Sequence, residues 1–259
     1  RPSYFQQAGA ETFPDTWEEL FTVGKALKEM GKPIGQALGH SLGDPPSFTY
    51  AYMWAYGAME VEADGTTVSF NKPEFVDGMQ TFIQGWKDAF DETGLAWDDG
   101  ANNAAFLSDQ ISATLNGSSI YLKAMGPEAD GGVPAIAADM NHADFPQGPA
   151  GRFTNIGAQS WGITTYSKNV DGARSFLEYW NSPDQLTSWY EANGGYYIPA
   201  APNYTSLEIF TADPKLAPYL NLVNYGRNKG YAGPSDDKAA LSYSKYIVID
   251  TFARAVQDG

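Results

Sequence analysis

Residues 13–33 read FPDTWEELFTVGKALKEMGKP, and this stretch shows how the chain builds its first packed element. Thr16 and Glu19 have the spacing of a capping box, in which each side chain accepts a hydrogen bond from the backbone N–H of the other. Apolar residues then recur every three or four positions, at Leu20, Val23, Leu27 and Met30. A glycine and a proline follow, so we expect an amphipathic helix over 17–30 that packs on a core.

A second helix is expected to begin near Ser47, after a loop at 39–46 that contains several glycines and prolines. It carries five aromatic side chains, at Phe48, Tyr50, Tyr52, Trp54 and Tyr56. This density is too high for one buried stripe, so we expect some of these rings to face a groove or a neighbouring lobe.

The rest of the chain mixes helical and extended patterns. Apolar and polar residues alternate over 59–63 and 66–70 around Asp64-Gly65, which predicts a β-hairpin. Further helices are expected at 73–90, 104–107, 171–180, 183–193 and 238–257, and short strands at 34–38, 111–115, 143–145 and 160–166. Helices interleaved with short strands predict an α/β chain, and no internal repeat is visible.

The composition excludes several classes of partner. Lys and Arg number 16 against 31 Asp and Glu, a net charge of −15 that repels phosphate backbones and anionic lipid headgroups. Acidic surfaces often serve only to keep a protein soluble, so the charge does not identify a partner. The 259 residues contain no cysteine and no run of about 18 apolar residues, so we expect no disulfide and no membrane insertion in this span. The first residues lack the apolar stretch of a secretory signal; either a signal was removed or, as we expect, the chain begins inside a longer protein.

The sequence offers no clear catalytic or metal-binding motif. His40 and His142 have no partner at metal-ligand spacing, and phosphate-binding glycine loops are missing, so we expect no metal, no cofactor and no catalytic residues. The segment 158–162, AQSWG, resembles a loosened nucleophile elbow. In α/β-hydrolases the histidine follows the serine along the chain, whereas both histidines here precede Ser160, which argues against an enzyme. With 31 acidic residues, a glycosidase-type carboxylate pair is not excluded by sequence.

Several motifs follow one another in a recognisable order. They are YFQQAG at 4–9, FPDTWEEL at 13–20, EADG at 62–65 leading into FNKPE at 70–74, the segment 106–117 ending in Asn-Gly, SWGI and SKN within 160–169, FLEYW at 176–180 and NGGYYIP at 193–199. Together they resemble the family 1 extracellular solute-binding proteins of bacterial ABC importers, the group that includes maltodextrin-binding protein. The resemblance covers almost the whole chain but begins well inside the usual length of the family.

The resemblance implies an α/β, type II periplasmic-binding fold with two lobes. Residues 1–160 are then the first part of the C-terminal lobe, and 161–225 are the returning segment of the N-terminal lobe with its hinge crossings. Residues 226–259 are the final helices of the C-terminal lobe.

In function, the resemblance implies capture of a sugar or oligosaccharide at the periplasmic or extracellular face of the membrane. Closure of the lobes then presents the sugar to the transmembrane subunits of an ABC permease. We expect a secreted monomer that binds its ligand without turnover and has no nucleic-acid partner.

The resemblance also places candidate ligand-binding residues at the cleft. They are Asp44, Ser47, Phe48, Asn116, Ser118, Ser119, Tyr121, Gln159, Ser160, Trp161, Tyr196, Tyr243 and Tyr246. Sugar sites combine aromatic platforms with hydrogen-bonding side chains, and this set contains both. Ser119 stands where the family motif often carries tryptophan, and a different or smaller sugar is one explanation.

Each leading candidate also has an ordinary structural interpretation. Trp161 either stacks on a sugar ring or belongs to the core, and Asp44 either accepts hydroxyl hydrogens or caps a helix. Asn116 either contacts ligand or shapes its turn with Gly117. The spacing of Tyr243 and Tyr246 suggests that one of them is a core residue.

Two other functions stay open at this stage. The excess of acidic over basic residues gives mild support to a receptor for polyamines or other cationic solutes, although the many aromatic residues favour sugars. A fragment of a carbohydrate-active enzyme would need two carboxylates about 5–10 Å apart across a cleft.

Overall fold

The computed structural model describes all 259 residues, which form two compact units. Unit 1 contains residues 1–156 and 222–259, and unit 2 contains residues 157–221. The chain is largely helical. The one regular strand pair joins β1 (Thr154–Asn155) in parallel to β2 (Gly226–Arg227), and both strands lie in unit 1 close to where the chain leaves and re-enters it.

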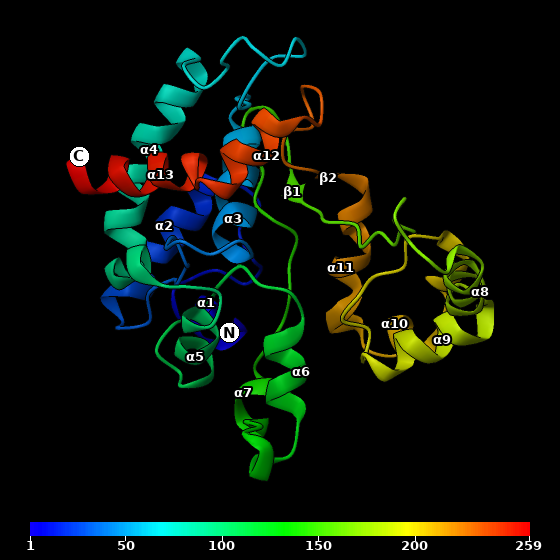
Figure 1. Cartoon of the computed structure of the whole chain (residues 1–259). Helices are drawn as coiled ribbons and strands as arrows, with labels where there is room; N and C mark the ends of the chain where they lie inside the picture. Colours follow the sequence, from blue (N-terminus) through cyan, green and yellow to red (C-terminus); the bar gives the residue numbers. More distant parts are fainter. The chain divides into compact units, whose positions relative to one another are not determined.

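Unit 1 is built around α3 (Asp44–Ala55), with α2 (Trp17–Glu29), α4 (Pro73–Ala89) and α13 (Ile247–Asp258) forming the rest of its core (Figure 1). Helix α2 packs on α4, and α13 packs on both α3 and α4. The smaller helices of unit 1 are α1 (Pro2–Gln7), α5 (Ala101–Leu107), α6 (Ser119–Met125), α7 (Pro134–Ala138) and α12 (Asp237–Ser244), with short 3₁₀ turns η1 (Glu92–Ala96), η2 (Glu128–Asp130) and η5 (Leu222–Asn224).

The start of α2 confirms the capping box. Thr16 accepts a hydrogen bond from the Glu19 backbone N–H, and the Glu19 carboxylate accepts from the Thr16 N–H. The hairpin is confirmed as one antiparallel bridge between Val61 and Val68, with Gly65 at a positive φ of 67° in its turn. The long helix from Pro73 is also confirmed, because α4 ends at Ala89.

The aromatic residues of α3 differ from the prediction. None of the five rings is exposed: Phe48, Tyr50, Tyr52, Trp54 and Tyr56 are all at most 5% accessible. Every residue of α3 from Phe48 to Ala55 is buried, so its aromatic density reflects burial on all sides of the helix. Helix α3 also begins at Asp44, three residues before the predicted start, because Pro45 and Pro46 are accommodated in its first turn.

Most of the predicted strands are extended segments with little pairing. Residues 34–38 are buried, but only Ile34 forms bridges, one to Phe90 and one to Ala113. The segments 143–145 and 160–166 form no strand, because none of their residues takes part in a β-bridge. The predicted final helix is two helices, α12 and α13, separated at Tyr246, whose φ of 58° is left-handed and cannot continue an α-helix.

Unit 2 is a small set of helices, with no strand. Helices α8 (Val170–Trp180) and α9 (Pro183–Ala192) confirm the two predicted there, and Gly194 and Gly195 at positive φ end the second. The turn η3 (Pro202–Tyr204), α10 (Glu208–Thr211), η4 (Pro214–Leu216) and α11 (Ala217–Asn221) follow. No side chain of α8 is buried, although its sequence is amphipathic.

The packing around α3 centres on Tyr52. Its ring centroid lies 4.8 Å from that of Trp17, 5.2 Å from Phe82 and 5.8 Å from Phe252, and its hydroxyl donates to the Gly78 carbonyl at 2.7 Å. We predict that Tyr52→Ala lowers the free energy of unfolding by about 3–5 kcal/mol, because it removes a buried ring, and Tyr52→Phe by about 1 kcal/mol for the lost hydrogen bond. Urea unfolding measures both. Equal losses for the two variants would contradict the central role of the ring.

Candidate functional site

The loop before α3 is held in place by one carboxylate. Asp99 accepts hydrogen bonds from the Ser41 hydroxyl at 2.7 Å and from the backbone N–H groups of Gly43 and Asp44 at 3.2 and 2.7 Å. Because three donors converge on Asp99, the loop has one defined path across the end of α3. This path leaves His40 and Leu42 exposed along one edge of unit 1 and the other side chains of residues 40–47 half-buried, except those of Pro45 and Pro46, which are buried.

Asp44 and Asn116, predicted from separate segments, lie side by side in the structure. The Asp44 carboxylate accepts from the side-chain amide of Asn102 at 2.8 Å and from that of Asn116 at 2.9 Å. Asn116 in turn accepts from the Ser119 hydroxyl at 3.0 Å. The structure therefore joins three of the predicted residues into one hydrogen-bonded group.

Burial raises the pKa of Asp44 to about 7, and the neighbouring charge of Asp99 adds to this effect, while the Asn102 amide acts in the opposite direction. A carboxylate at the first turn of a helix is normally stabilised by the helix dipole. Here the cost of desolvation is larger, so Asp44 exchanges its proton near neutral pH.

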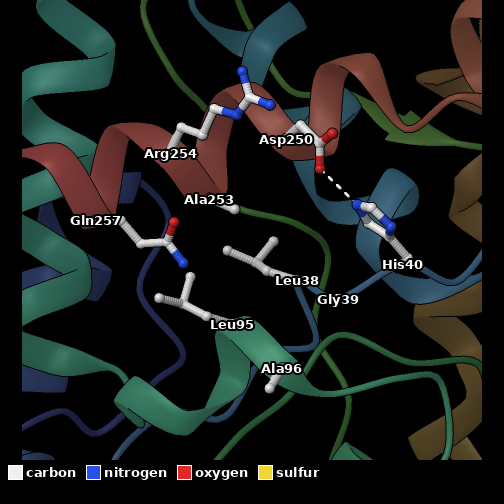
Figure 2. Close-up of a pocket in the computed structure, with 9 residues that line it drawn as sticks. All are labelled: Leu38, Gly39, His40, Leu95, Ala96, Asp250, Ala253, Arg254 and Gln257. Atoms are coloured by element: carbon white, nitrogen blue, oxygen red, sulfur yellow. Dashed lines mark hydrogen bonds and ion pairs between the residues drawn. The ribbon is translucent and has the colours of Figure 1, made fainter.

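The junction of α12 and α13 forms the other end of this edge. The His40 ring stacks on the Tyr246 ring with centroids 4.3 Å apart and planes 5° from parallel. His40 Nε2 lies 2.7 Å from an Asp250 carboxylate oxygen, as the dashed line in Figure 2 shows. The Tyr243 hydroxyl donates to the Leu42 carbonyl, so the same loop contacts α12 as well.

His40 and Asp250 were not among the residues predicted for the site. The sequence did contain a signal for each, because His40 lies in the glycine- and proline-containing loop and Asp250 lies one helical turn after Tyr246. We call the group formed by residues 40–47, Asn116, Ser119, Tyr243 and Tyr246 the polar strip.

Other predicted residues of unit 1 are packed into the protein. Phe48 is buried against Trp17, with ring centroids 5.5 Å apart, and Tyr121 is buried beside His142 at 5.3 Å. Ser118 is buried at the start of α6. Ser47 donates to the Gly43 carbonyl and accepts from the Asn155 amide, which connects the strip to β1.

Four predicted residues belong to unit 2. Gln159 and Ser160 are exposed on a segment without regular secondary structure. Trp161 is 58% exposed, and its ring lies 5.8 Å from Trp180 and 6.5 Å from Phe176. Tyr196 is also exposed, and its ring lies 4.9 Å from that of Tyr197.

The structure shows no group of three or more histidine or acidic side chains arranged to hold a metal ion. No helix is both long and apolar enough to cross a bilayer.

Comparison with known proteins identifies the family. Residues 1–218 match the sequence profile of the bacterial extracellular solute-binding proteins, and the chain belongs to this family. Among curated proteins, no relative matches the sequence.

Several solved structures with the same fold are named for a sugar that they bind. A sugar transporter of Arthrobacter chlorophenolicus A6 with bound laminaribiose is 19% identical, with a TM-score of 0.76 over 99% of this chain and 66% of its own. An ABC transporter solute-binding protein of Thermotoga lettingae bound to α-D-tagatose is 15% identical, with a TM-score of 0.75 over 99% and 63%. The cyclic α-maltosyl-1,6-maltose binding protein of Arthrobacter globiformis is 22% identical, with a TM-score of 0.65 over 98% and 67%.

These matches show that the chain has the type II periplasmic-binding fold, as predicted. The chain spans about two thirds of the length of these structures, between 63% and 67%.

The raised pKa of Asp44 gives a testable pH dependence. Between the ordinary value of 3.8 and about 7, the unfolded chain has lost the Asp44 proton while the folded chain retains it, so stability falls as pH rises through this window. Asp44→Asn removes this dependence and keeps an oxygen that accepts from Asn102 and Asn116. We expect the variant to gain stability relative to the native chain between pH 4 and 7, as measured by urea unfolding at each pH.

Asp64→Asn provides a control of opposite sign, because hydrogen bonds from Thr67 and Thr66 lower the pKa of Asp64. Asp64→Asn should therefore be less stable than the native chain at neutral pH, and the difference should disappear in acid. If the difference in unfolding free energy between Asp44→Asn and the native chain were the same at every pH, the raised pKa of Asp44 would be contradicted.

Proposed function

We propose that this chain is the solute-capturing part of a bacterial ABC importer and that its solute is a sugar or oligosaccharide. In this proposal unit 1 is the C-terminal lobe and unit 2 is the returning segment of the N-terminal lobe. Binding takes place in the periplasm or at the extracellular face of the membrane. Closure of the lobes on the sugar then gives the permease a surface to recognise.

The polar strip is the observation that supports this function. It presents a carboxylate, a carboxamide, hydroxyls and an aromatic pair along one edge of unit 1. Sugars carry hydroxyl groups that need hydrogen-bonding partners and C–H faces that pack on aromatic rings. A buried polar group without a partner costs about 1–3 kcal/mol, so fixed partners such as Asp44 and Asn116 discriminate between sugars by hydroxyl position.

In this proposal the protein binds without turnover and acts as a monomer. Asp99, the carboxylate whose charge acts on Asp44, accepts three hydrogen bonds from the loop and serves to hold that loop. This role favours a binding site over a catalytic carboxylate pair.

A ligand screen tests the proposal. The complete natural protein and this 259-residue chain would be heated with monosaccharides, oligosaccharides, polyols and polyamines, and the melting temperature recorded. We expect a rise in melting temperature with a sugar and no hydrolysed product by chromatography. The proposal would be overturned if no sugar raised the melting temperature, or if the sugar that raised it were hydrolysed.

A receptor for cationic solutes is the second candidate. Asp44 and Asp99 lie together, and neither forms a salt bridge with a lysine or arginine of the chain. An ammonium group of a ligand would neutralise such a pair. The polyamine samples of the screen separate this candidate from the sugar receptor.

Trp161 supplies a mutational test in unit 2. Since Trp161 is 58% exposed, Trp161→Ala should change the melting temperature little, while loss of a stacking surface should weaken sugar affinity at least tenfold. Tyr166→Ala is the matched control, because Tyr166 is a 79% exposed aromatic residue of the same unit outside the predicted site. Titration calorimetry measures both. An equal effect of the two variants would show that Trp161 has no specific role.

A further inference from the structure

Lys229 lies in the turn between β2 and α12, beside the polar strip. Its Nζ is 4.5 Å from the centroid of the Tyr243 ring, which belongs to the strip. The Tyr243 hydroxyl donates to the Leu42 carbonyl, and this bond fixes the position of the ring. A half-buried lysine is therefore placed where α12 meets the loop of residues 40–47.

The backbone around Lys229 has a defined conformation. The Tyr231 N–H donates to the Asn228 carbonyl at 3.1 Å, which closes a β-turn with Lys229 and Gly230 at its centre. Gly230 has a positive φ of 72°, which glycine adopts without strain, and its N–H donates to the Glu60 carboxylate at 3.0 Å. The turn is thus tied to the body of unit 1, and the Lys229 side chain starts from a fixed position.

The ammonium of Lys229 has no anionic partner in the chain. It forms no ion pair, although the chain has 31 acidic residues against 16 basic ones. Burial lowers the pKa of Lys229, and no carboxylate acts against this effect. Burial acts on Lys32 as well, but the contacts of Lys32 with Asp109 and Tyr4 outweigh it and raise the pKa. An aromatic face compensates an ammonium only in part, so Lys229 retains a desolvation cost that a bound anion would remove.

The carboxylates in and around the polar strip have other partners. Asp99 accepts three hydrogen bonds from the loop, and Asp250 lies 2.7 Å from His40. Asp44 accepts from two side-chain amides, and burial raises its pKa to about 7, so it holds a proton for part of the time at neutral pH. An anion bound beside Lys229 therefore meets less than a full negative charge at Asp44.

We propose that Lys229 determines specificity at the polar strip by binding an anionic group of the sugar, so that the solute is an acidic saccharide. An ammonium is a compact charge with three N–H donors, and it can donate to the oxygens of a carboxylate, sulfate or phosphate without a fixed geometry. Lys229 would also repel the ammonium groups of a cationic solute. This inference rests on the proposed function and adds the charge of the ligand to it.

Calorimetric titration of the complete natural protein tests the inference with matched neutral and acidic probes. One series is glucose, glucuronic acid, glucose 6-sulfate and glucose 6-phosphate, and a second is galactose, galacturonic acid, galactobiose and digalacturonic acid. We expect an acidic member of at least one series to bind at least tenfold more tightly than its neutral counterpart. The member that binds best identifies the anion as carboxylate, sulfate or phosphate.

Lys229→Met removes the charge and keeps a side chain of similar length over the Tyr243 ring. We expect this variant to weaken the acidic ligand at least tenfold, to leave the neutral counterpart within twofold, and to reduce the weakening of acidic binding by added salt. Lys229→Arg keeps the charge and should restore most of the affinity. Lys238→Met is the matched control, since Lys238 is an exposed lysine of α12 outside the strip, and melting temperatures verify that each variant is folded.

The outcomes separate the two proposals. If the native protein binds neutral sugars and no acidic counterpart binds more tightly, the inference fails while the proposed function stands. The same holds if Lys229→Met weakens acidic and neutral sugars equally, because Lys229 would then bind hydroxyls. If the native protein binds no saccharide, neutral or acidic, the proposed function itself fails.

Discussion

The burial of α3 from Phe48 to Ala55 is the constraint on which the structure of unit 1 depends. Every aromatic ring of this helix is covered, and Tyr52 contacts rings from three separate segments, at Trp17, Phe82 and Phe252. Buried aromatic side chains contribute large apolar areas to a core, and these contacts join α2, α4 and α13 into one body. Because α3 cannot shift without disturbing all three neighbours, its ends have fixed positions.

Because α3 is fixed in the core, its N-terminal end holds the residues of the polar strip in place. Asp44 is the first residue of α3, and Asp99 anchors the loop that leads into it. The other end of the strip depends on α13, whose Phe252 packs against Tyr52 and whose Asp250 contacts His40. A site whose side chains are placed by packed helices can hold a sugar with little loss of conformational entropy on binding.

The sequence predicted the local elements of this structure better than its long-range packing. The capping box at Thr16 and the hairpin at Asp64-Gly65 depend on residues close in sequence, and both are present. The break at Tyr246 was missed because no glycine or proline marks it; a left-handed residue held by stacking on His40 depends on a contact 206 positions away, 246 − 40. The burial of α3 was missed for a related reason, since it depends on segments far away in the sequence, among them β1 and α13.

In the candidate site, too, the sequence predicted some residues correctly and missed those that depend on long-range packing. Asp44, Asn116 and Ser119 were predicted from three motif positions and form one hydrogen-bonded group in the structure. Phe48 and Tyr121 were predicted with them but are buried, because family motifs include the residues that pack beneath a site as well as those that face it. His40 and Asp250 were not predicted, because their contact joins the loop before α3 to α13, 210 positions away along the chain.

A crystal structure of the complete natural protein with a bound saccharide tests the central claim most directly. The account predicts that the sugar contacts the Asp44 carboxylate and the Asn116 carboxamide, with a ring face against His40 or Tyr246. A sugar bound to the protein without contact to residues 40–47 would contradict the assignment of the polar strip as the binding site.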